Sequence, residues 1–295
     1  MLDTTAAANT IEIVVAPSYE EAVFKNNAIL QHFPFGGMSE GDTAYRWTIH
    51  SGANGSVTTF DENDALPDAG QQAFVRGAVS YIHTVGTMQI TGHARAALRS
   101  GYINHIEDES TLLREDLADL TSTTVISGTN GLETAIDSTT AYAGLTRGAT
   151  YFDSQETAVG GVMSFDAMKD MYYNLIDAEV GSRPTTILMS PTQESKFYDI
   201  AGQPGIKQFM PNDPASGMSN QQFNGVPIAA IPDMTNSIAL FLDQRGSNWV
   251  YKIHRPLEVH FRQRAGDSDV FDFITAFILV CRNPKKQGKL TGLST

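Results

Sequence analysis

The sequence has few of the residues that crosslink a chain, anchor it in a membrane or bind a phosphate backbone. Its single cysteine, Cys281, lies in the apolar run FITAFILVC, so an internal disulfide is excluded and a buried, unreactive thiol is predicted. No run of about eighteen apolar residues is present, and we therefore expect no membrane-spanning segment. What remains is an ordinary globular composition, with 41% hydrophobic residues.

Positive charge is also scarce. The 20 basic residues are outnumbered by 33 acidic ones, which gives a net charge of −13. Because such a chain repels a phosphate backbone, a dedicated nucleic-acid-binding protein is disfavoured unless the basic residues cluster. The one locally basic segment is RNPKKQGKL, Arg282 to Leu290, and its simplest interpretation is a short solvated tail.

Patterns typical of catalytic and ligand sites are missing as well: there is no P-loop, dinucleotide fingerprint, HExxH or CxxC. GMSEG matches the G-x-S-x-G nucleophile elbow at Ser39, but that elbow needs a buried strand before the serine and a helix after it. Here the polar segment DTAYRWTIH follows. The acidic runs DENDALPD and DSD lack the spacing of a calcium-binding EF-hand loop. We therefore expect no catalytic residue, no cofactor and no metal site.

The longest regular pattern that is present predicts a helix between Gly101 and Gly128. Its apolar positions recur at steps of seven, four and three, and acidic residues fill the opposite face. The predicted apolar face consists of Ile106, Leu113, Leu117 and Leu120. Because the acidic residues lie on the polar face, we interpret them as solvated charge rather than as a catalytic pair.

Before this helix, residues 35–91 predict one long β-hairpin. Strand-like segments flank the acidic, turn-rich run FDENDALPDAGQQ, Phe60 to Gln72, which forms the tip. A two-stranded hairpin of this length is not stable alone in water, so it needs a surface that covers it. We expect that surface to belong to another subunit.

After the helix the pattern predicts a mixed α/β body. Ser164 caps an amphipathic helix that begins at Phe165, and the strand TTILMS leads into a helix at Pro191 with Ser190 as its N-cap and Gln193 completing a capping box. A long loop follows from Ala201 to Gly225. Several strands then return, with Pro256 expected to interrupt them.

The order of these segments resembles that of the tailed-bacteriophage major capsid proteins. The resemblance covers nearly the whole chain: an arm, a long hairpin, a long helix, the turn GTNGLETA, the pair ILMSPTQESKFYDI and FNGVPIAAIPDM, and the strands VYKIHRPLEVHFRQR and FDFITAFILVCRNP. It implies an α+β fold, the phage major capsid fold, with an N-terminal arm, an extended β-hairpin loop, a peripheral domain with a long spine helix, and an α/β axial domain.

The resemblance also implies a division of the chain and a set of contacts. The expected parts are the arm at 1–33, the hairpin loop at 34–91, the peripheral domain at 92–128 and 247–281, and the axial domain at 129–246 and 282–295. The hairpin would lie across a neighbouring subunit, and the loop Ala201 to Gly225 would meet its copies around the local symmetry axes. The candidate intersubunit contacts are Trp47, Tyr81, Phe209 and Met210, and polar replacement of Trp47 or Tyr81 is expected to block assembly of a folded monomer.

The function implied is a structural one, in which hexamers and pentamers of the chain form an icosahedral shell around packaged DNA without sequence-specific binding. The shell is located in the virion and is assembled in the host cytoplasm. About thirty residues precede the hairpin, so a separate scaffolding protein is expected, or a scaffolding segment that has been removed. A portal and decoration proteins are further expected partners.

Two features qualify this expectation. Some family members join subunits by a lysine–asparagine bond from the hairpin, but this sequence has no lysine between Lys25 and Lys169, so we expect a non-covalent shell. Composition does not separate a viral capsid from an encapsulin-like compartment of the same fold that encloses cargo. Two hypotheses from different functional classes are a serine hydrolase using Ser39 and a tail or decoration protein.

Overall fold

The structure is a computed structural model that describes residues 33, 35–36, 43–52, 54–59, 68, 70–93, 102–146, 152–177, 181–201, 222–263 and 267–294. The chain divides into two compact units. Unit 1 comprises Met1–Thr43, Ser80–Leu132 and Trp249–Val280, and unit 2 comprises Ala44–Val79, Glu133–Asn248 and Cys281–Thr295. Each unit is therefore assembled from three separate segments of the sequence.

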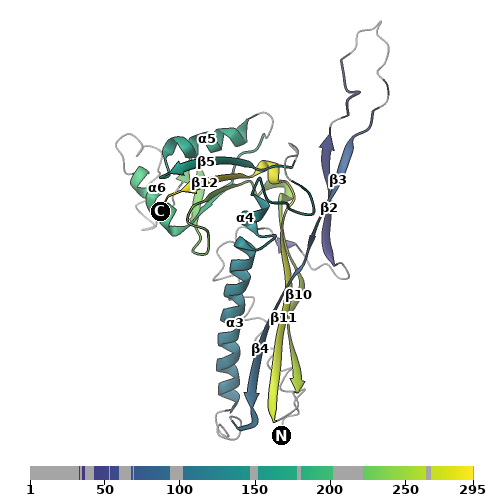
Figure 1. The fold of residues 1–295 in the computed structure, drawn as a ribbon, viewed down its shortest axis with the longest axis vertical. Coiled ribbons are helices and arrows are strands. Elements are labelled where there is room, and N and C mark those ends of the chain that lie inside the picture. The colour runs from purple at the N-terminus through teal and green to yellow at the C-terminus, as the bar shows by residue number, and fades with distance from the viewer. Residues whose placement is uncertain are drawn as a thin grey trace. The chain divides into compact units, whose positions relative to one another are not determined.

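Unit 1 is a four-stranded sheet with one long helix. The strand order is β1 (Phe35–Gly36), β10 (Trp249–Gln263), β11 (Ser268–Cys281) and β4 (Ile82–Thr91). β1 runs parallel to β10, and β4 pairs antiparallel with β11 from Ile82↔Phe277 to Thr91↔Ser268. The helix α3 (Tyr102–Ser127) packs along β4 (Figure 1).

The predicted long helix is confirmed by α3, but its buried face differs from the predicted one. Leu117 is buried as expected, whereas Leu120 is 48% exposed. The buried face instead includes Ser110, Thr121 and Ser122, beside Ala118, Val125 and Ile126. Small hydroxyl residues fit there because the hydroxyl can donate a hydrogen bond to a backbone carbonyl of the same helix. Thr121 Oγ1, for example, donates to the carbonyl of Leu117 at 2.7 Å.

Unit 2 is built on a six-stranded mixed sheet. Its strand order is β5 (Gln155–Gly161), β12 (Gly288–Leu293), β9 (Ala239–Leu242), β6 (Thr186–Met189), β8 (Val226–Ala230) and β7 (Gln222–Phe223). The predicted helices correspond to α5 (Phe165–Ile176) and α6 (Pro191–Ala201). Three further short helices are α4 (Leu132–Ala135), η3 (Arg245–Ser247) and η4 (Pro284–Lys286).

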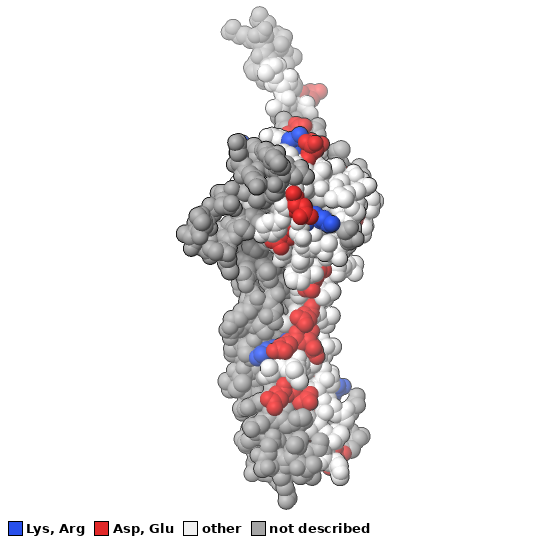
Figure 2. All heavy atoms as spheres, turned by 90° about the vertical axis from the view of Figure 1, so that its left-hand side faces the viewer, with Lys and Arg blue, Asp and Glu red and all other residues white. Residues whose placement is uncertain are grey.

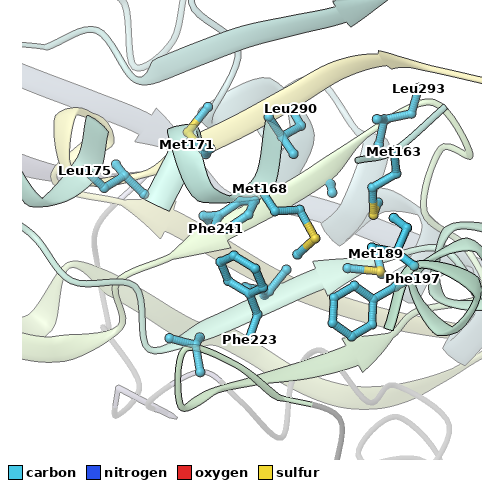
Figure 3. Close-up of a cluster of buried hydrophobic side chains, with 14 residues drawn as sticks. Met163, Met168, Met171, Leu175, Met189, Phe197, Phe223, Phe241, Leu290 and Leu293 are labelled. Carbon is cyan, nitrogen blue, oxygen red and sulfur yellow. The ribbon is translucent and has the colours of Figure 1, made fainter. Parts of the chain in front are cut away.

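The core of unit 2 is rich in methionine. Met168, Met171 and Leu175 of α5 are fully buried against the strands, and Met163 and Met189 join them (Figure 3). Methionine fills irregular gaps because its unbranched side chain adapts to its neighbours. The Ser164 hydroxyl accepts from the Ala167 N–H at 3.1 Å, which confirms the predicted N-cap.

The segment predicted as one long hairpin forms two separate structures. Only β2 (Ala44–Gly52) and β3 (Ala73–Ser80) pair with each other, as a two-stranded sheet that belongs to unit 2. The next strand, β4, leaves this pair after Tyr81 and joins the sheet of unit 1. β4 pairs with a strand almost two hundred residues away in the sequence, which local patterning could not indicate.

Two further expectations are corrected by the structure. Pro256 does not interrupt the strands, because β10 continues through it as one strand. The basic segment from Arg282 to Leu290 is not a solvated tail, because it forms η4 and then enters the sheet of unit 2 as β12. None of the described helices is both long enough and apolar enough to cross a membrane.

Candidate assembly surfaces on the hairpin and the long helix

The hairpin β2–β3 has two different faces. Along both strands the burial alternates, as expected for strands with one covered face. The covered face carries Trp47, Ile49, Gly77 and Val79. The opposite face is exposed, so one side of the hairpin packs on its own chain and the other is left uncovered by it.

Trp47 anchors the covered face within unit 2. Its indole Nε1 donates to the carbonyl oxygen of Arg282 at 3.2 Å, and its side chain is 6% exposed. Gly77 on the paired strand leaves room for the indole, since a Cβ at this position would lie 2.9 Å from Trp47 Cε2. The glycine is therefore required by close packing of the ring rather than by backbone conformation.

A second anchor lies at the base of β3. The Ala78 N–H donates to the carbonyl of Ala143 at 3.0 Å. Ala143 lies in a tight turn closed by a bridge between Tyr142 and Leu145, and it has a left-handed φ of 57°. Non-glycine residues rarely adopt this conformation. The contacts around the turn must therefore stabilise the unusual backbone of Ala143, whose carbonyl accepts the hydrogen bond from β3.

The exposed face of the hairpin carries positive charge and one aromatic ring. Arg46, His50 and Arg76 are exposed on it, and neither strand contains a carboxylate. Phe74 is 59% exposed and packs edge-on against the His50 ring with centroids 5.5 Å apart. An exposed phenylalanine on a face that also carries two arginines is typical of a protein contact surface.

Beyond the paired strands, hydrogen bonds between Asn54, Ser56 and Gly70 join the two sides of the hairpin. Asn54 Nδ2 donates to the Gly70 carbonyl at 3.1 Å, and the Gly70 N–H donates to Ser56 Oγ at 3.1 Å. The Ser56 N–H completes the ring by donating to Asn54 Oδ1 at 3.0 Å. A Cβ on Gly70 would collide with Asn54, so these hydrogen bonds require glycine there.

The outward face of α3 has the opposite charge. Exposed carboxylates occur on successive turns at Asp108, Glu109, Glu115, Asp116 and Asp119, and Figure 2 shows acidic side chains gathered where α3 lies. Leu112 and Leu120 are 58% and 48% exposed within this face. From Asp108 to Ser127 the one basic residue is Arg114, which is half-buried. The face thus combines negative charge with two exposed leucines.

Tyr81, the second predicted contact residue, is buried within unit 1. Its side chain is 7% exposed, and its ring stacks on that of His254 with centroids 4.4 Å apart. Little of Tyr81 or Trp47 is therefore available to a neighbouring subunit. The other two predicted contacts, Phe209 and Met210, lie outside the described residues, as do Ser39, most of the arm and most of the loop Ala201 to Gly225.

The described residues offer little for catalysis. No group of three or more His, Cys, Asp or Glu side chains among them could hold a metal ion. A small ion cluster lies on β10, where Arg255 donates to Glu258 and the His260 ring lies 3.2 Å from the same carboxylate. The hydrogen bond from Arg255 lowers the pKa of Glu258, so the carboxylate stays ionised. The three side chains are one third to one half exposed, so the cluster is a partly exposed ion pair.

The exposed contact candidates Arg46, Phe74 and Arg76 do not stand out from the sequence by residue type. The alternation in AFVRGAVS places Phe74 and Arg76 on one face and Val75, Gly77 and Val79 on the other, and this is the signal that could have found them. Aromatic size directs attention to Trp47 and Tyr81 instead, although large aromatic rings are as common in cores as in interfaces.

Comparisons with known proteins agree with this architecture. The family model described as SU10 major capsid protein matches residues 35–294. No curated protein sequence matches the chain significantly.

Several solved structures have the same fold at low sequence identity. The capsid of cyanophage A-1(L) has 13% identity and a TM-score of 0.67, with 92% of this chain and 93% of that chain covered. The capsid of a native GTA particle has 14% identity and a TM-score of 0.62, with 91% of each chain covered. The SrpI encapsulin of Synechococcus elongatus PCC 7942 has 12% identity and a TM-score of 0.63, with 91% of this chain and 88% of that chain covered.

Proposed function

The chain belongs to the SU10 major capsid protein family, and from this premise we propose how its copies hold together. As a phage major capsid protein it has the phage capsid fold, is located in the virion, and forms the capsid shell from many copies of itself. We make proposals for the contact that joins those copies, for the domain boundaries of the chain, and for its further partners.

We propose that the exposed face of the hairpin of one copy lies on the outward face of α3 of a neighbouring copy. The observation that carries this proposal is the complementary charge. The hairpin strands contain Arg46 and Arg76 and no carboxylate, whereas α3 presents Asp116, Asp119 and further carboxylates. Opposite potentials favour this pairing and disfavour hairpin-to-hairpin contact.

Apolar side chains support the same pairing. Phe74 on the hairpin and Leu112 and Leu120 on α3 are about half or more exposed within their chain. Burying an aromatic ring between two leucines removes apolar surface from water on both partners, at roughly 25 cal/mol per Å². The charged residues then form the rim of the contact, as is common in protein interfaces.

In this arrangement Trp47 and Tyr81 act indirectly. We propose that Trp47 holds the covered face of the hairpin and thereby presents Arg46 and Phe74, while Tyr81 fixes the start of β4 through its stack on His254. We retain Phe209 and Met210, in the loop Ala201 to Gly225, as proposed contacts around the symmetry axes.

We propose the following division of the chain: an arm at 1–33, a hairpin loop at 34–91, a peripheral domain at 92–128 and 247–281, and an axial domain at 129–246 and 282–295. The presence of α3 together with β10 and β11 in unit 1 supports the peripheral assignment. The place of β4 in that same sheet favours moving residues 82–91 from the hairpin to the peripheral domain.

The proposed partners follow from the function. Copies would form hexamers and pentamers, with a scaffolding protein, a portal and decoration proteins as further proposed partners, and the shell would enclose DNA without reading its sequence. An encapsulin-like compartment is the competing proposal, favoured by the likeness to the SrpI encapsulin. Nucleic acid in purified particles would support the viral capsid, and protein cargo without nucleic acid would support the compartment.

A charge-reversal series tests the hairpin contact. Arg46→Glu with Arg76→Glu, or Asp116→Lys with Asp119→Lys, should each reduce shell formation, because like charges then face each other. At about 1 kcal/mol per surface pair, each lost contact weakens association about five-fold, and the effect multiplies over many copies. Combining both double variants should restore assembly. The measurement is sedimentation together with negative-stain electron microscopy.

The control for this series is Lys169→Glu with Lys196→Glu, on α5 and α6, which changes the net charge of the chain by the same amount as the arginine variant. It should assemble like the wild type. Normal shells from either reversed variant, or failure of the combination to restore shells, would refute the hairpin–helix contact.

The family is a structural one, and we further propose that the chain has no catalytic activity. The competing hypothesis is a hydrolase using Ser39. Labelling by an active-site serine probe that disappears in Ser39→Ala would establish the hydrolase; unchanged shells and no labelling would support the proposal.

A further inference from the structure

The basic segment after β11 is held as a rigid turn. Its 3-10 helix η4 brings Arg282, Lys285 and Lys286 together within five residues. The turn is fixed by backbone hydrogen bonds from the Lys286 N–H to the Asn283 carbonyl at 3.2 Å and from the Gln287 N–H to the Pro284 carbonyl at 2.8 Å. Gln287 is fully buried and Pro284 is buried too, so the turn is attached to the core, with Lys286 exposed and Arg282 and Lys285 half-buried.

A second basic turn adjoins the first. Asn283 Nδ2 donates to Asn248 Oδ1 at 2.7 Å, and the Arg282 N–H donates to the Asn248 carbonyl at 2.7 Å. Asn248 ends η3, which begins at Arg245, and the Arg245 guanidinium donates to the carbonyl of Arg183 at 2.6 Å. These contacts bring two turns of unit 2 and Arg183 next to one another, and we name their five cationic residues the cationic corner: Arg183, Arg245, Arg282, Lys285 and Lys286.

One member of the cationic corner, Arg245, is paired with a carboxylate, that of Asp243. Asp243 is buried, which raises its pKa, but hydrogen bonds from Arg245 and from Ser182 at 2.6 Å outweigh burial and hold the pKa below its usual range. Its negative charge is thus compensated by Arg245. Among the described residues no carboxylate pairs with the side chains of the other four cations.

This surface also lacks the apolar component of a protein interface. The large apolar side chains that are exposed in the described part of the chain lie elsewhere, on the hairpin, on α3, on β4, and on or beside α5 and α6. A contact between proteins usually buries an apolar centre, whereas a contact with phosphates needs cations and a fixed backbone. The composition of the corner therefore fits a polyanion better than a second protein surface.

We propose that the cationic corner binds the phosphate backbone of nucleic acid, independently of sequence. This goes beyond shell formation and rests on the proposed function only in that a capsid encloses a genome. The net charge of −13 limits the strength of the contact, because the rest of the chain repels a polyanion. A few cations that attract DNA, on a chain whose net charge repels it, should bind DNA weakly and lose affinity steeply as salt rises. Weak binding suits DNA that must later leave the shell.

The expected salt dependence can be calculated from the counterions released. One phosphate contact for each of the four cations not paired with a carboxylate gives a log–log slope of about −3.6, so binding weakens about 150-fold as salt rises from about 50 to about 200 mM. Removing two of these four contacts should reduce the slope to about −1.8 and the loss to about 12-fold over the same range.

The experiment measures binding of a short labelled DNA duplex to the full, unassembled chain by fluorescence anisotropy across this salt range. The test variant is Lys285→Gln with Lys286→Gln, and Arg183→Gln with Lys286→Gln is a second pair should the first reduce the melting temperature. The control is Lys169→Gln with Lys196→Gln, which removes the same charge from α5 and α6. The proposal requires a lower slope in the test variants and an unchanged slope in the control.

Three results would overturn the proposal. One is absence of DNA binding by the wild type at low salt, and another is an equal loss in the control variant, which would mean that net charge alone acts. The third is loss of self-association in the test variant with DNA binding unchanged, which would make the corner an interface between copies. Because shell formation is scored separately by electron microscopy, failure of this proposal is distinguishable from failure of the hairpin contact.

Discussion

At the residue scale, Trp47 is the buried side chain that holds the hairpin in place and so positions the exposed side chains on its other face. Its indole is buried, occupies the space left by Gly77 and donates to the carbonyl of Arg282. Trp47→Ala should lower the free energy of unfolding by about 3 to 5 kcal/mol, because it leaves a cavity and an unpaired carbonyl. Urea unfolding of the unassembled chain measures this loss.

Phe74→Ala is the matched comparison on the same hairpin. Since Phe74 is 59% exposed, its removal should change the free energy of unfolding by less than about 0.5 kcal/mol while reducing shell formation. A fully stable Trp47→Ala monomer would contradict this account and would return Trp47 to the direct contact role expected from the sequence.

The ion pair between Lys289 and Asp137 gives a prediction with a defined pH window. Lys289 Nζ lies 3.0 Å from Asp137 Oδ2, with 8% and 23% of the two side chains exposed. Burial raises the pKa of Asp137, but hydrogen bonds from Thr139 and Lys289 outweigh it and hold the pKa well below the usual range. A carboxyl with a lowered pKa stabilises the fold above its unfolded pKa of about 3.9, and this stabilisation is lost as the pH falls further.

Asp137→Asn should therefore cost about 3 kcal/mol near neutral pH, because it leaves a buried ammonium without its counterion. The difference from the wild type should shrink as the pH falls below about 4. Urea titrations at several pH values test this, with the exposed Asp166→Asn as the control expected to show little difference at any pH. A difference that grows at low pH would exclude the assigned role of Asp137.

At the element scale, the contact of α3 with β4 depends on one glycine. A Cβ on Gly86 would lie 2.9 Å from Leu113 Cδ1 and 3.3 Å from Leu117 Cδ1. Gly86→Ala should displace the helix from the strand and lower the free energy of unfolding by about 1 to 3 kcal/mol. Chemical denaturation followed by circular dichroism measures this loss, and Leu120→Ala on the exposed face should leave the unfolding midpoint nearly unchanged.

The elements that can be predicted from the sequence are those whose determinants are local. The helix after Ser164 has its cap and its apolar face within about fifteen residues, and the structure reproduces both. Its end differs, because the sequence predicts an end at Gly181 and the helix ends at Ile176. At α6 the prediction is half right, since Ser190 Oγ accepts from the Gln193 N–H at 3.4 Å. The Gln193 side chain does not complete a capping box, because its amide donates instead to the carbonyls of Asn236 and Ser294.

Elements that depend on distant partners could not be predicted in this way. The strand pattern of residues 73–91 is continuous, and only pairing with β11 shows that β4 belongs to a different sheet from β3. The basic segment Arg282 to Leu290 was wrongly predicted to be solvated for the same reason. Lys289 is buried beside Asp137, its ion-pair partner, which lies 152 positions away in the sequence. The exposed residues of the hairpin could not be identified from the sequence, because the difference in exposure between Phe74 and Trp47 depends on tertiary packing.

At the scale of the whole molecule, the absence of lysine between Lys25 and Lys169 predicts how the shell is held together. A hairpin without a lysine amine cannot donate one to an isopeptide bond, so we expect the contacts around it to be non-covalent. Purified shells heated in denaturant should run as single chains on electrophoresis without reducing agent. A ladder of covalent oligomers would contradict this expectation.

The position of β11 and β12 late in the sequence determines when the chain can fold during translation. In unit 1 the edge strand β4 has to wait for β11, and in unit 2 β12 is inserted between β5 and β9. Both sheets therefore stay incomplete until the ribosome has made nearly all of the described chain, since contacts between distant segments form only when both are present. A fragment from synthesis interrupted before β11 lacks a finished sheet in either unit, so we expect such fragments to be excluded from a growing particle by their inability to fold.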